Sequence, residues 1–319
     1  MSNHNVISKL KLISVVTACF NEEENVADLY RHVKAVFDEL PQYNYEHIFI
    51  DNASKDRTVT ILKDIARNDH RVKIIVNTRN YGHIRSPYHA LMQAKGDVVI
   101  SIVADLQDPP TMIKEFVKKW EEGYKIVIGI KSQSEESKIF FAVRKTYYNL
   151  VGRLSEIELI KNFTGFGLYD QQVIEILRSI EDPYPYFRGL ICDIGFERAV
   201  IEYVQPSRKR GFTKNNLYTL YDMAMLGITN HSKVPLRLAT MTGFAVAFLN
   251  LIVALGYFIY KLIFWNSFTV GIAPLVIGLF FFASVQLFFI GIIGEYIGSI
   301  HTQVLKRPLV VEKERINFD

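Results

Sequence analysis

The first 135 residues alternate short apolar runs with longer segments in which apolar residues recur at helical spacing. Such runs are typical of strands buried on both faces of a parallel sheet, and the segments between them are typical of helices that cover it. The predicted strands are residues 12–18, 46–51, 72–76, 97–103 and 125–130, and the predicted helices are residues 23–40, 56–68, 86–95 and 111–122. The pattern therefore predicts an α/β domain with a mostly parallel sheet.

The chain after residue 235 has a different pattern. No charged side chain lies between Arg237 and Lys261, and none lies between Lys261 and Glu295. Each stretch is long enough to cross about 30 Å of hydrocarbon as a helix. Buried core helices of a soluble protein rarely run this long without a polar face. We therefore predict two transmembrane helices, at about 238–262 and 268–294.

The short polar run Trp265, Asn266 and Ser267 predicts a tight turn between the two helices. Basic residues flank the pair on both sides, whereas Lys261 alone lies near the turn. These flanking residues are His231, Lys233, Arg237, Lys306, Arg307, Lys313 and Arg315. By the positive-inside rule, both ends of the chain are expected to face the cytoplasm.

Composition narrows the class of protein further. The 37 basic and 33 acidic residues give 37 − 33 = +4, which is too mild to indicate a nucleic-acid partner. Cys19 and Cys192 are the only cysteines and fit neither a disulfide framework nor a zinc site. Residues 1–11 lack the apolar core of a secretory signal, so the first domain is expected to stay in the cytoplasm.

Residues 137–160 combine basic and aromatic side chains at helical spacing, with Arg144 among the basic ones. This pattern is typical of a helix lying on the membrane surface. An ordinary surface helix of a soluble domain has a similar composition, and the sequence leaves both interpretations open.

Three of the predicted strands end in acidic or amide-rich segments, residues 19–23, 51–56 and 103–108. Ligands of open α/β sheets bind beyond the carboxyl ends of the strands, so these segments are the candidate site. A glycine-rich dinucleotide motif and a P-loop are both missing from the sequence. A carboxylate-lined pocket instead suggests Mg²⁺ or Mn²⁺ bound together with a substrate diphosphate.

Several of these segments resemble the inverting family-2 glycosyltransferases, which have the A-type, Rossmann-like nucleotide-sugar fold. The resemblance in the first half lies in Asn21-Glu22-Glu23, residues 51–58, Asn80-Tyr81-Gly82, Gly96-Asp97 and residues 105–110. In the second half, Pro235-Leu236-Arg237, residues 294–298 and Arg307-Pro308 are similar to polyprenyl-phosphate glycosyltransferases, the group of bactoprenol glucosyltransferase and dolichol-phosphate mannose synthase. The resemblance covers nearly the whole chain.

The resemblance implies a donor site at the strand ends, with Asp51 near the base. The residues it assigns to the nucleotide are Ala18, Phe20, Asn21, Glu22, Asp51, Ser54, Asn80 and Ala104. It makes Asp105 the catalytic metal ligand and Gln107 its helper. The sequence departs from the family's Asp-x-Asp motif, because Val103 replaces the first acid. That replacement is expected to weaken metal binding or to rearrange the nucleotide contacts.

The acceptor implied by the resemblance is a lipid phosphate, whose second pKa of ~6 makes it an anion at neutral pH. Such a nucleophile needs no general base, and catalysis rests on cations that hold it in line. The candidates are Arg144, as a second catalytic residue, with Arg208 and Lys214. The alternative for the segment 207–214 is a generic basic patch attracted to anionic lipid.

The expected reaction is transfer of one sugar, glucose from UDP-glucose, to polyprenyl (undecaprenyl) phosphate with inversion. The β-linked lipid product would serve cell-envelope glycan modification. The expected place is the inner (plasma) membrane, with a cytoplasmic catalytic domain (1–215), a juxtamembrane segment (216–235), the two helices (236–296) and a cytoplasmic tail (297–319). A homo-oligomer formed by the hairpins and a downstream flippase are further expected partners.

Alternatives remain at this point. GDP-mannose and UDP-N-acetyl sugars are other candidate donors. A processive polysaccharide synthase shares the catalytic domain, but the chain lacks the Gln-x-x-Arg-Trp motif of such enzymes. A catalytically silent membrane scaffold that binds nucleotide-sugar or lipid is a third interpretation, which Val103 in place of an acid keeps open.

Overall fold

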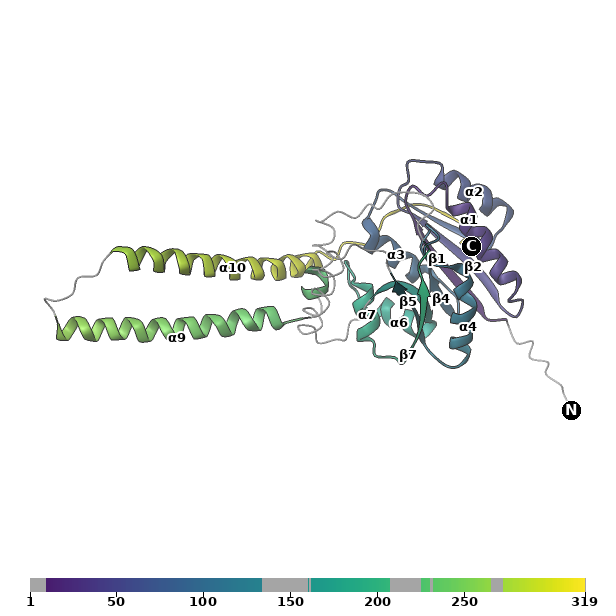
Figure 1. Ribbon diagram of the computed structural model, residues 1–319. Helices are drawn as coiled ribbons and strands as arrows, with labels where there is room; N and C mark the ends of the chain where they lie inside the picture. Colours follow the sequence, from purple (N-terminus) through teal and green to yellow (C-terminus); the bar gives the residue numbers. More distant parts are fainter. Residues whose placement is uncertain are drawn as a thin grey trace. The chain divides into compact units, whose positions relative to one another are not determined.

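The computed structural model describes residues 10–133, 160, 162–206, 225–229, 232–264 and 272–318. The chain divides into two compact units (Figure 1). One contains the sheet with its helices and also the chain that follows residue 304. The other contains the two long helices α9 and α10.

The first unit is built on a mixed sheet with the strand order β7-β5-β6-β4-β1-β2-β3-β8 among the described residues. Its strands are β1 (Leu12–Cys19), β2 (Asn44–Asp51), β3 (Val72–Asn77), β4 (Val98–Ser101), β5 (Ile126–Gln133), β6 (Phe163–Asp170), β7 (Arg198–Val204) and β8 (Glu312–Ile316). The central strands β4, β1, β2 and β3 are mutually parallel, whereas β6 and β8 run antiparallel to their neighbours. The five predicted strands are confirmed, and so is the α/β fold class.

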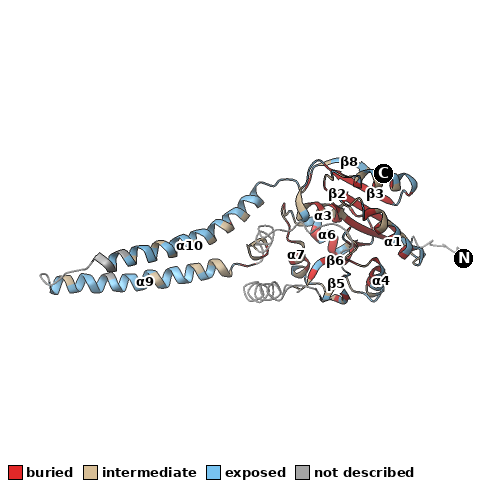
Figure 2. Ribbon diagram, turned by 45° about the horizontal axis from the view of Figure 1, so that its top comes forward, coloured by how far each residue is buried: buried red, intermediate tan, exposed pale blue. Residues whose placement is uncertain are grey.

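Helices cover both faces of the sheet, and each face has its own apolar core (Figure 2). Buried side chains of α1 (Val26–Asp38), α2 (Thr58–Asn68) and α4 (Ile113–Glu121) pack on one face. Those of α3 (Gly82–Gln93), α6 (Gln171–Ser179) and α7 (Phe187–Asp193) pack on the other. This arrangement explains why the central strands are apolar on both sides, because neither face meets solvent.

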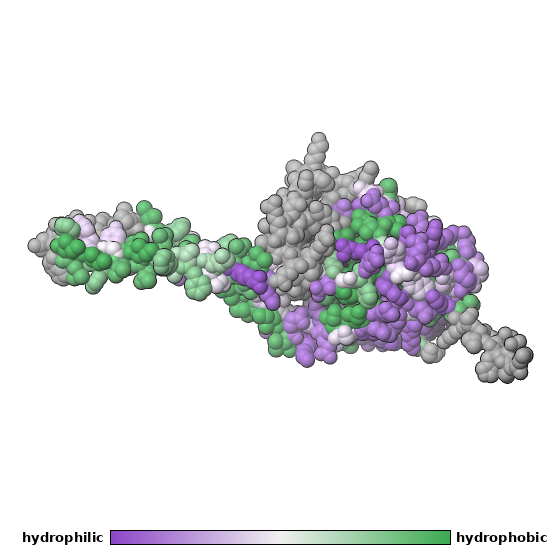
Figure 3. Space-filling model, turned by 90° about the horizontal axis from the view of Figure 1, so that it is seen from below, coloured by the Kyte–Doolittle hydropathy of each residue, from purple (hydrophilic) through white to green (hydrophobic). Residues whose placement is uncertain are grey.

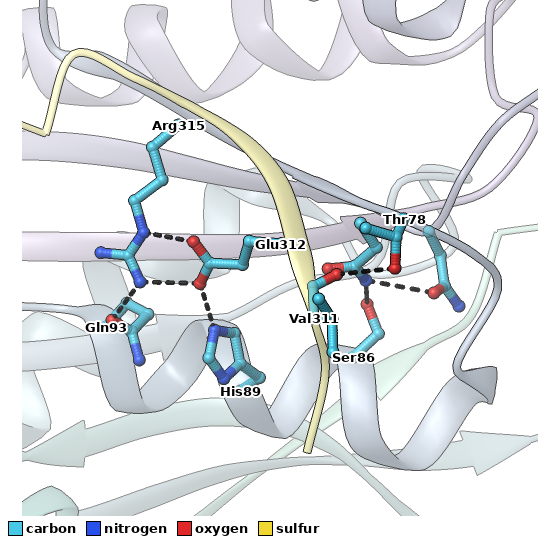
Figure 4. Close-up of polar contacts among 9 residues, drawn as sticks. Thr78, Ser86, His89, Gln93, Val311, Glu312 and Arg315 are labelled. Atoms are coloured by element: carbon cyan, nitrogen blue, oxygen red, sulfur yellow. Dashed lines mark hydrogen bonds and ion pairs between the residues drawn. The ribbon is translucent and has the colours of Figure 1, made fainter. Parts of the chain in front are cut away.

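The strand β8 lies in the segment 297–319, which the sequence analysis gives as a cytoplasmic tail. In this segment α10 continues to Val304, and β8 then pairs antiparallel with β3. Figure 4 shows how it is attached: Thr78 donates its N–H and its hydroxyl to the carbonyl of Val311, at 3.0 and 3.1 Å. The carboxylate of Glu312 pairs with His89 on α3 and with Arg315.

The second unit contains α9 (Val234–Ile263) and α10 (Ile272–Val304), both long and apolar enough to cross a membrane. Their large apolar side chains are mostly exposed, for example Phe244 at 74% and Phe288 at 66%. Figure 3 shows the resulting hydrophobic surface. A core helix of a soluble protein is mostly buried, whereas the most apolar windows of these two helices are 0% buried within the described residues. The predicted turn at 265–267 lies outside the described residues.

Candidate active site

The three candidate segments leave the same edge of the sheet, because β1, β2 and β4 are parallel. Cys19 at the end of β1 pairs in register with Asp51 at the end of β2. On the other side of β1, the N–H of Ile102 donates to the carbonyl of Val16 at 3.0 Å, so the segment that carries Asp105 follows directly from the neighbouring strand. The sheet topology therefore brings the three segments to one edge.

Each of the three segments contains a non-glycine residue with left-handed backbone. The φ angles are 55° at Asn21, 62° at Ala53 and 60° at Leu106. Asparagine tolerates this conformation, but for residues such as alanine and leucine it costs about 1–2 kcal/mol each. Left-handed backbone at all three strand ends, strained at Ala53 and Leu106, indicates loops whose shape serves a ligand rather than the stability of the fold.

The loops after β1 and β2 are joined by hydrogen bonds from backbone to side chain. The N–H of Asn21 donates to Ser54 Oγ at 2.8 Å, and Asn21 Oδ1 accepts from the N–H of Lys55 at 2.8 Å. The N–H of Glu22 donates to Thr58 Oγ1 at 2.9 Å. Asn21, Glu22 and Ser54 are thus brought together, and the side chains of Asn21 and Ser54 hold the two loops in one fixed arrangement.

Asp51 lies between these loops and is fully buried. Its Oδ2 accepts from the N–H of Ser54 at 2.9 Å, whereas its Oδ1 is buried and has no hydrogen-bond partner. Burial raises the pKa of Asp51, and the hydrogen bonds from Ser54 partly oppose that shift. A buried acceptor without a donor is costly, so the position is suited to an N–H group of a ligand.

Asn52 lies in the segment 51–58, where the sequence predicts no role for it. In the structure it is the centre of a hydrogen-bond network. Its Nδ2 donates to Asn80 Oδ1 at 2.9 Å and to the carbonyl of Gly82 at 3.1 Å. Its Oδ1 accepts from the N–H of Tyr81 at 2.8 Å and from Asn77 Nδ2 at 3.2 Å. Asn52 therefore fixes the loop after β3, including the predicted residue Asn80, beside the loop after β2.

The segment after β4 forms a tight turn around Asp105, whose Oδ1 accepts from the N–H of Gln107 at 3.1 Å. Ala104 is buried, and Val103 is 43% exposed where the family motif has its first acid. No group of three or more His, Cys, Asp or Glu side chains is placed to hold a metal within the described ranges. Asp105 and Gln107 fit a hard cation that takes its remaining ligands from a substrate diphosphate and water.

Sequence reasoning missed the role of Asp108, three residues further along. It is only 2% exposed and accepts from the hydroxyl of Tyr203 on β7 at 2.7 Å. Burial raises its pKa to about 6, although the Tyr203 hydrogen bond and the Lys131 charge lower it. The bond ties the Asp105 turn to a distant strand. Its partner lies about a hundred residues away, so the local sequence gave no signal for it.

The structure describes two of the remaining predicted site residues but not the other three. Ala18 and Phe20 are half-buried at the end of β1, next to the joined loops. Arg144, Arg208 and Lys214 lie outside the described residues, as does most of the predicted surface helix at 137–160. Their assignment to the acceptor phosphate therefore stays a prediction.

Comparison with known proteins was consistent with this site. The family model described as glycosyl transferase family 2 matches residues 14–176, which contain all three strand-end segments. The uncharacterized glycosyltransferase YkcC of Bacillus subtilis is 33% identical, over 96% of this chain and 94% of its own. The SfII prophage-derived bactoprenol glucosyl transferase of Shigella flexneri is 33% identical, over 95% of this chain and 97% of its own.

The fold also matches a solved structure. Glucosyl-3-phosphoglycerate synthase from Mycobacterium tuberculosis, in complex with Mn²⁺, UDP and phosphoglyceric acid, superposes with a TM-score of 0.51. The match has 21% sequence identity and covers 69% of this chain and 76% of that one. At that identity the match speaks for the fold, while the family match and the full-length relatives speak for membership. The chain is a glycosyltransferase and belongs to glycosyl transferase family 2.

Proposed function

We propose that this enzyme transfers a single glucose from UDP-glucose to polyprenyl (undecaprenyl) phosphate, with inversion. The supporting observation is the similarity to the Shigella bactoprenol glucosyl transferase, which extends over 303 residues and so beyond the sheet unit into the apolar helices. The product is a β-linked polyprenyl-phosphate glucose for modification of cell-envelope glycans.

The donor nucleotide is assigned to the joined loops. Asp51 Oδ1, buried and unpartnered, is suited to accept the N3–H of a uracil ring. Cytosine presents an acceptor at the same ring position, so it would leave the carboxylate unsatisfied. Asn21, Ser54 and Asn80 shape the loops around the nucleoside, with the segment from Ala18 to Glu22 along one side.

The diphosphate is assigned to the turn after β4. Asp105 and Gln107 would hold a divalent cation, Mg²⁺ or Mn²⁺, and that cation would neutralise charge on the nucleotide leaving group. With Val103 in place of a second acid, the chain supplies fewer charged ligands than the family motif. We therefore expect metal affinity to depend strongly on the bound donor.

The acceptor supplies its own nucleophile. An oxygen of the lipid phosphate, anionic near neutral pH, forms a bond to the anomeric carbon as the bond from that carbon to UDP breaks. UDP leaves with the electron pair, and attack from the opposite face inverts the configuration. Arg144, Arg208 and Lys214 are proposed to offset the repulsion between the two phosphates.

The membrane arrangement follows from the second unit. With α9 and α10 in the bilayer of the inner (plasma) membrane, the flanking basic residues favour a catalytic unit and both chain ends in the cytoplasm. The exposed apolar faces of the helices allow one hairpin to pack on another in a homo-oligomer. A lipid-linked glucose made on this side would need a downstream flippase to reach the outer face.

The test uses the full-length protein, purified in detergent, with polyprenyl phosphate and either Mg²⁺ or Mn²⁺. Radiolabelled UDP-glucose, GDP-mannose and UDP-N-acetyl sugars are supplied in turn, and the lipid phase is extracted and counted. Label from UDP-glucose alone is the expected result. Nucleotide binding without label in the lipid for any donor would contradict the proposal and favour the silent scaffold.

A further inference from the structure

Three guanidinium groups gather where α3 begins and where the chain returns from α10: Arg79 is next to Asn80 in the loop after β3, Arg85 lies on α3, and Arg307 follows α10. Arg79 Cζ lies 4.0 Å from the centroid of the Tyr81 ring, and Arg85 Cζ lies 5.7 Å from the same centroid. Arg85 Nη2 donates to the carbonyl of Pro308 at 2.6 Å, which places it beside Arg307, the preceding residue. The three arginines come from two segments that are more than two hundred residues apart.

The structure shows no ionic partner for this arginine cluster among the described residues. None of the three forms an ion pair with a carboxylate in the described part of the chain. Arg85 Nε is buried and has no hydrogen-bond partner. Burial lowers the pKa of Arg85, and the charges of Arg79 and Arg307 lower it further. Arg79 and Arg307 are exposed, but Arg85 is partly buried, and a partly buried cation with an unsatisfied N–H and no ionic partner favours an anion beside it.

The backbone holds Arg307 in this place. The chain leaves α10 through Lys306, which has left-handed backbone with φ of 44°, and Pro308 then prevents a return to helix. Two residues later, Val310 is buried, and Val311 is fixed by Thr78. The approach of Arg307 to Arg85 is therefore set by the fold rather than by a freely moving tail.

A pocket of about 450 Å³ opens next to the cluster, within the first unit. Arg307 lines it together with apolar side chains such as Met92 and Leu177, and the acidic residues Glu181 and Asp182 also line it. The other basic side chains at its rim are already engaged, because Lys306 pairs with Glu181 at 3.6 Å and Arg178 donates to backbone carbonyls. Arg307 is thus the cation at the rim that is left for a ligand.

We propose that Arg85 and Arg307, with Arg79 beside them, form a binding site for a phosphate group at the mouth of this pocket. The planar guanidinium fork matches two oxygens of a phosphate, and two such groups can share one anion. The site is separate from the donor site, which uses Asp51 and Asp105. The phosphate is carried either by a lipid headgroup or by a soluble molecule.

The lipid source rests on the proposed function, because it requires α10 to lie in a membrane. Arg307 is three residues beyond Val304, the last residue of α10, so it lies within about 10 Å of the helix end along the chain. The soluble source requires nothing of the membrane.

The experiment measures equilibrium binding to the full-length protein in a neutral detergent, at fixed ionic strength. The probes are inorganic phosphate, dioctanoyl phosphatidylglycerol and, as the uncharged-headgroup control, dioctanoyl phosphatidylcholine. Arg307 is exposed, so Arg307→Gln should fold, and Lys313→Gln removes the same charge from an exposed position on β8. We expect at least one phosphate probe to bind, with an apparent Kd raised about tenfold in Arg307→Gln and unchanged in Lys313→Gln.

The probes separate the two sources. Binding of phosphatidylglycerol without inorganic phosphate indicates a lipid headgroup, and binding of inorganic phosphate indicates a soluble ligand. Arg85→Lys, which keeps the charge but loses the fork, should also weaken binding. Binding lost in Asp105→Ala would place the anion at the diphosphate turn of the donor site and overturn the proposal, as would equal affinity in wild type and Arg307→Gln or no binding at all. None of these readings depends on transfer activity.

Discussion

At the end of β2, one carboxylate carries two separate tasks: Asp51 Oδ2 holds the Ser54 amide, while Oδ1 faces no donor. The substitution Asp51→Asn keeps an oxygen for Ser54 and puts an amide N–H₂ where the unpaired acceptor was. We predict that affinity for UDP falls about 10- to 100-fold, the value of a lost hydrogen bond to a charged group. Calorimetry with UDP measures it, and Asp64→Asn on the exposed face of α2 is the control. Unchanged affinity would remove Asp51 from the base site.

Asp105 is the other residue on which the proposed chemistry depends. We predict that Asp105→Ala lowers the rate of sugar transfer by at least about 100-fold, because the proposed cation at the leaving diphosphate would lose its carboxylate ligand. The side chain is half-buried in a turn, where it accepts a hydrogen bond from the N–H of Gln107, and we expect the melting temperature to change little. Asp38→Ala, exposed at the end of α1, serves as control. Retained activity would contradict a metal role for Asp105.

Individual site residues were predictable where an acidic side chain follows the end of an apolar strand. Asp51 and Asp105 are acids at the ends of apolar strands, and the rule that ligands bind beyond those ends was enough to select them. Asn52 and Asp108 have the same local signal, but their roles come from Asn80 and Tyr203, partners that only the folded chain brings near. The resemblance to the family indicated which ligands to expect. The structure identified the contacts that hold the site residues in place.

Among the strands, β2 contains a fully buried histidine, which makes stability depend on pH. Burial lowers the pKa of His47 to about 3, and its Nε2 lies 3.0 Å from Thr17 Oγ1. The unfolded chain binds the proton first, near pH 6.5, so stability falls as pH drops from 6.5 toward 3. We predict a loss of about 1.4 kcal/mol per pH unit in that window, which is missing in His47→Gln.

Unfolding of wild type and His47→Gln should be followed from pH 7 to pH 4.5, and the slopes compared. All other titrating groups are shared by the two proteins, so the difference in slope isolates His47. Equal slopes would mean that the imidazole is protonated in the folded state.

Two of the strands that the sequence did not predict, β6 and β8, lack a continuous apolar run. β6 contains Gly165 and Gly167, which read as turn residues, yet a Cβ at Gly167 would lie 2.4 Å from the carbonyl oxygen of Val127 on β5. Glycine there permits close strand approach rather than a turn. β8 is almost entirely charged, and its acids pair with Lys63 on α2 and His89 on α3. Such a strand is recognisable only once its partners are in place.

At the scale of the whole molecule, the hydroxyl of Tyr296 links α10 to the residues that precede α9. Tyr296 on α10 donates to the carbonyl of Ser232 at 2.7 Å, just before α9, and both residues are buried. We predict that Tyr296→Phe destabilises the second unit by about 1 kcal/mol, because the carbonyl loses its donor. Limited proteolysis around residue 232 in detergent measures this opening. The control is Ser284→Ala, whose hydroxyl bonds only within α10, and equal cleavage in the two variants would contradict the prediction.

The pairing of β8 with β3 also determines when the sheet is completed during synthesis. The ribosome delivers β8 after both long helices, so the sheet is completed only when the hairpin has already been made. Until then, or in any soluble fragment that stops before Val234, Val72–Asn77 is an apolar strand with one bare edge. Bare edges of this kind recruit strands from other chains, so such a fragment should aggregate, whereas synthesis of the chain through β8 gives the edge its own partner.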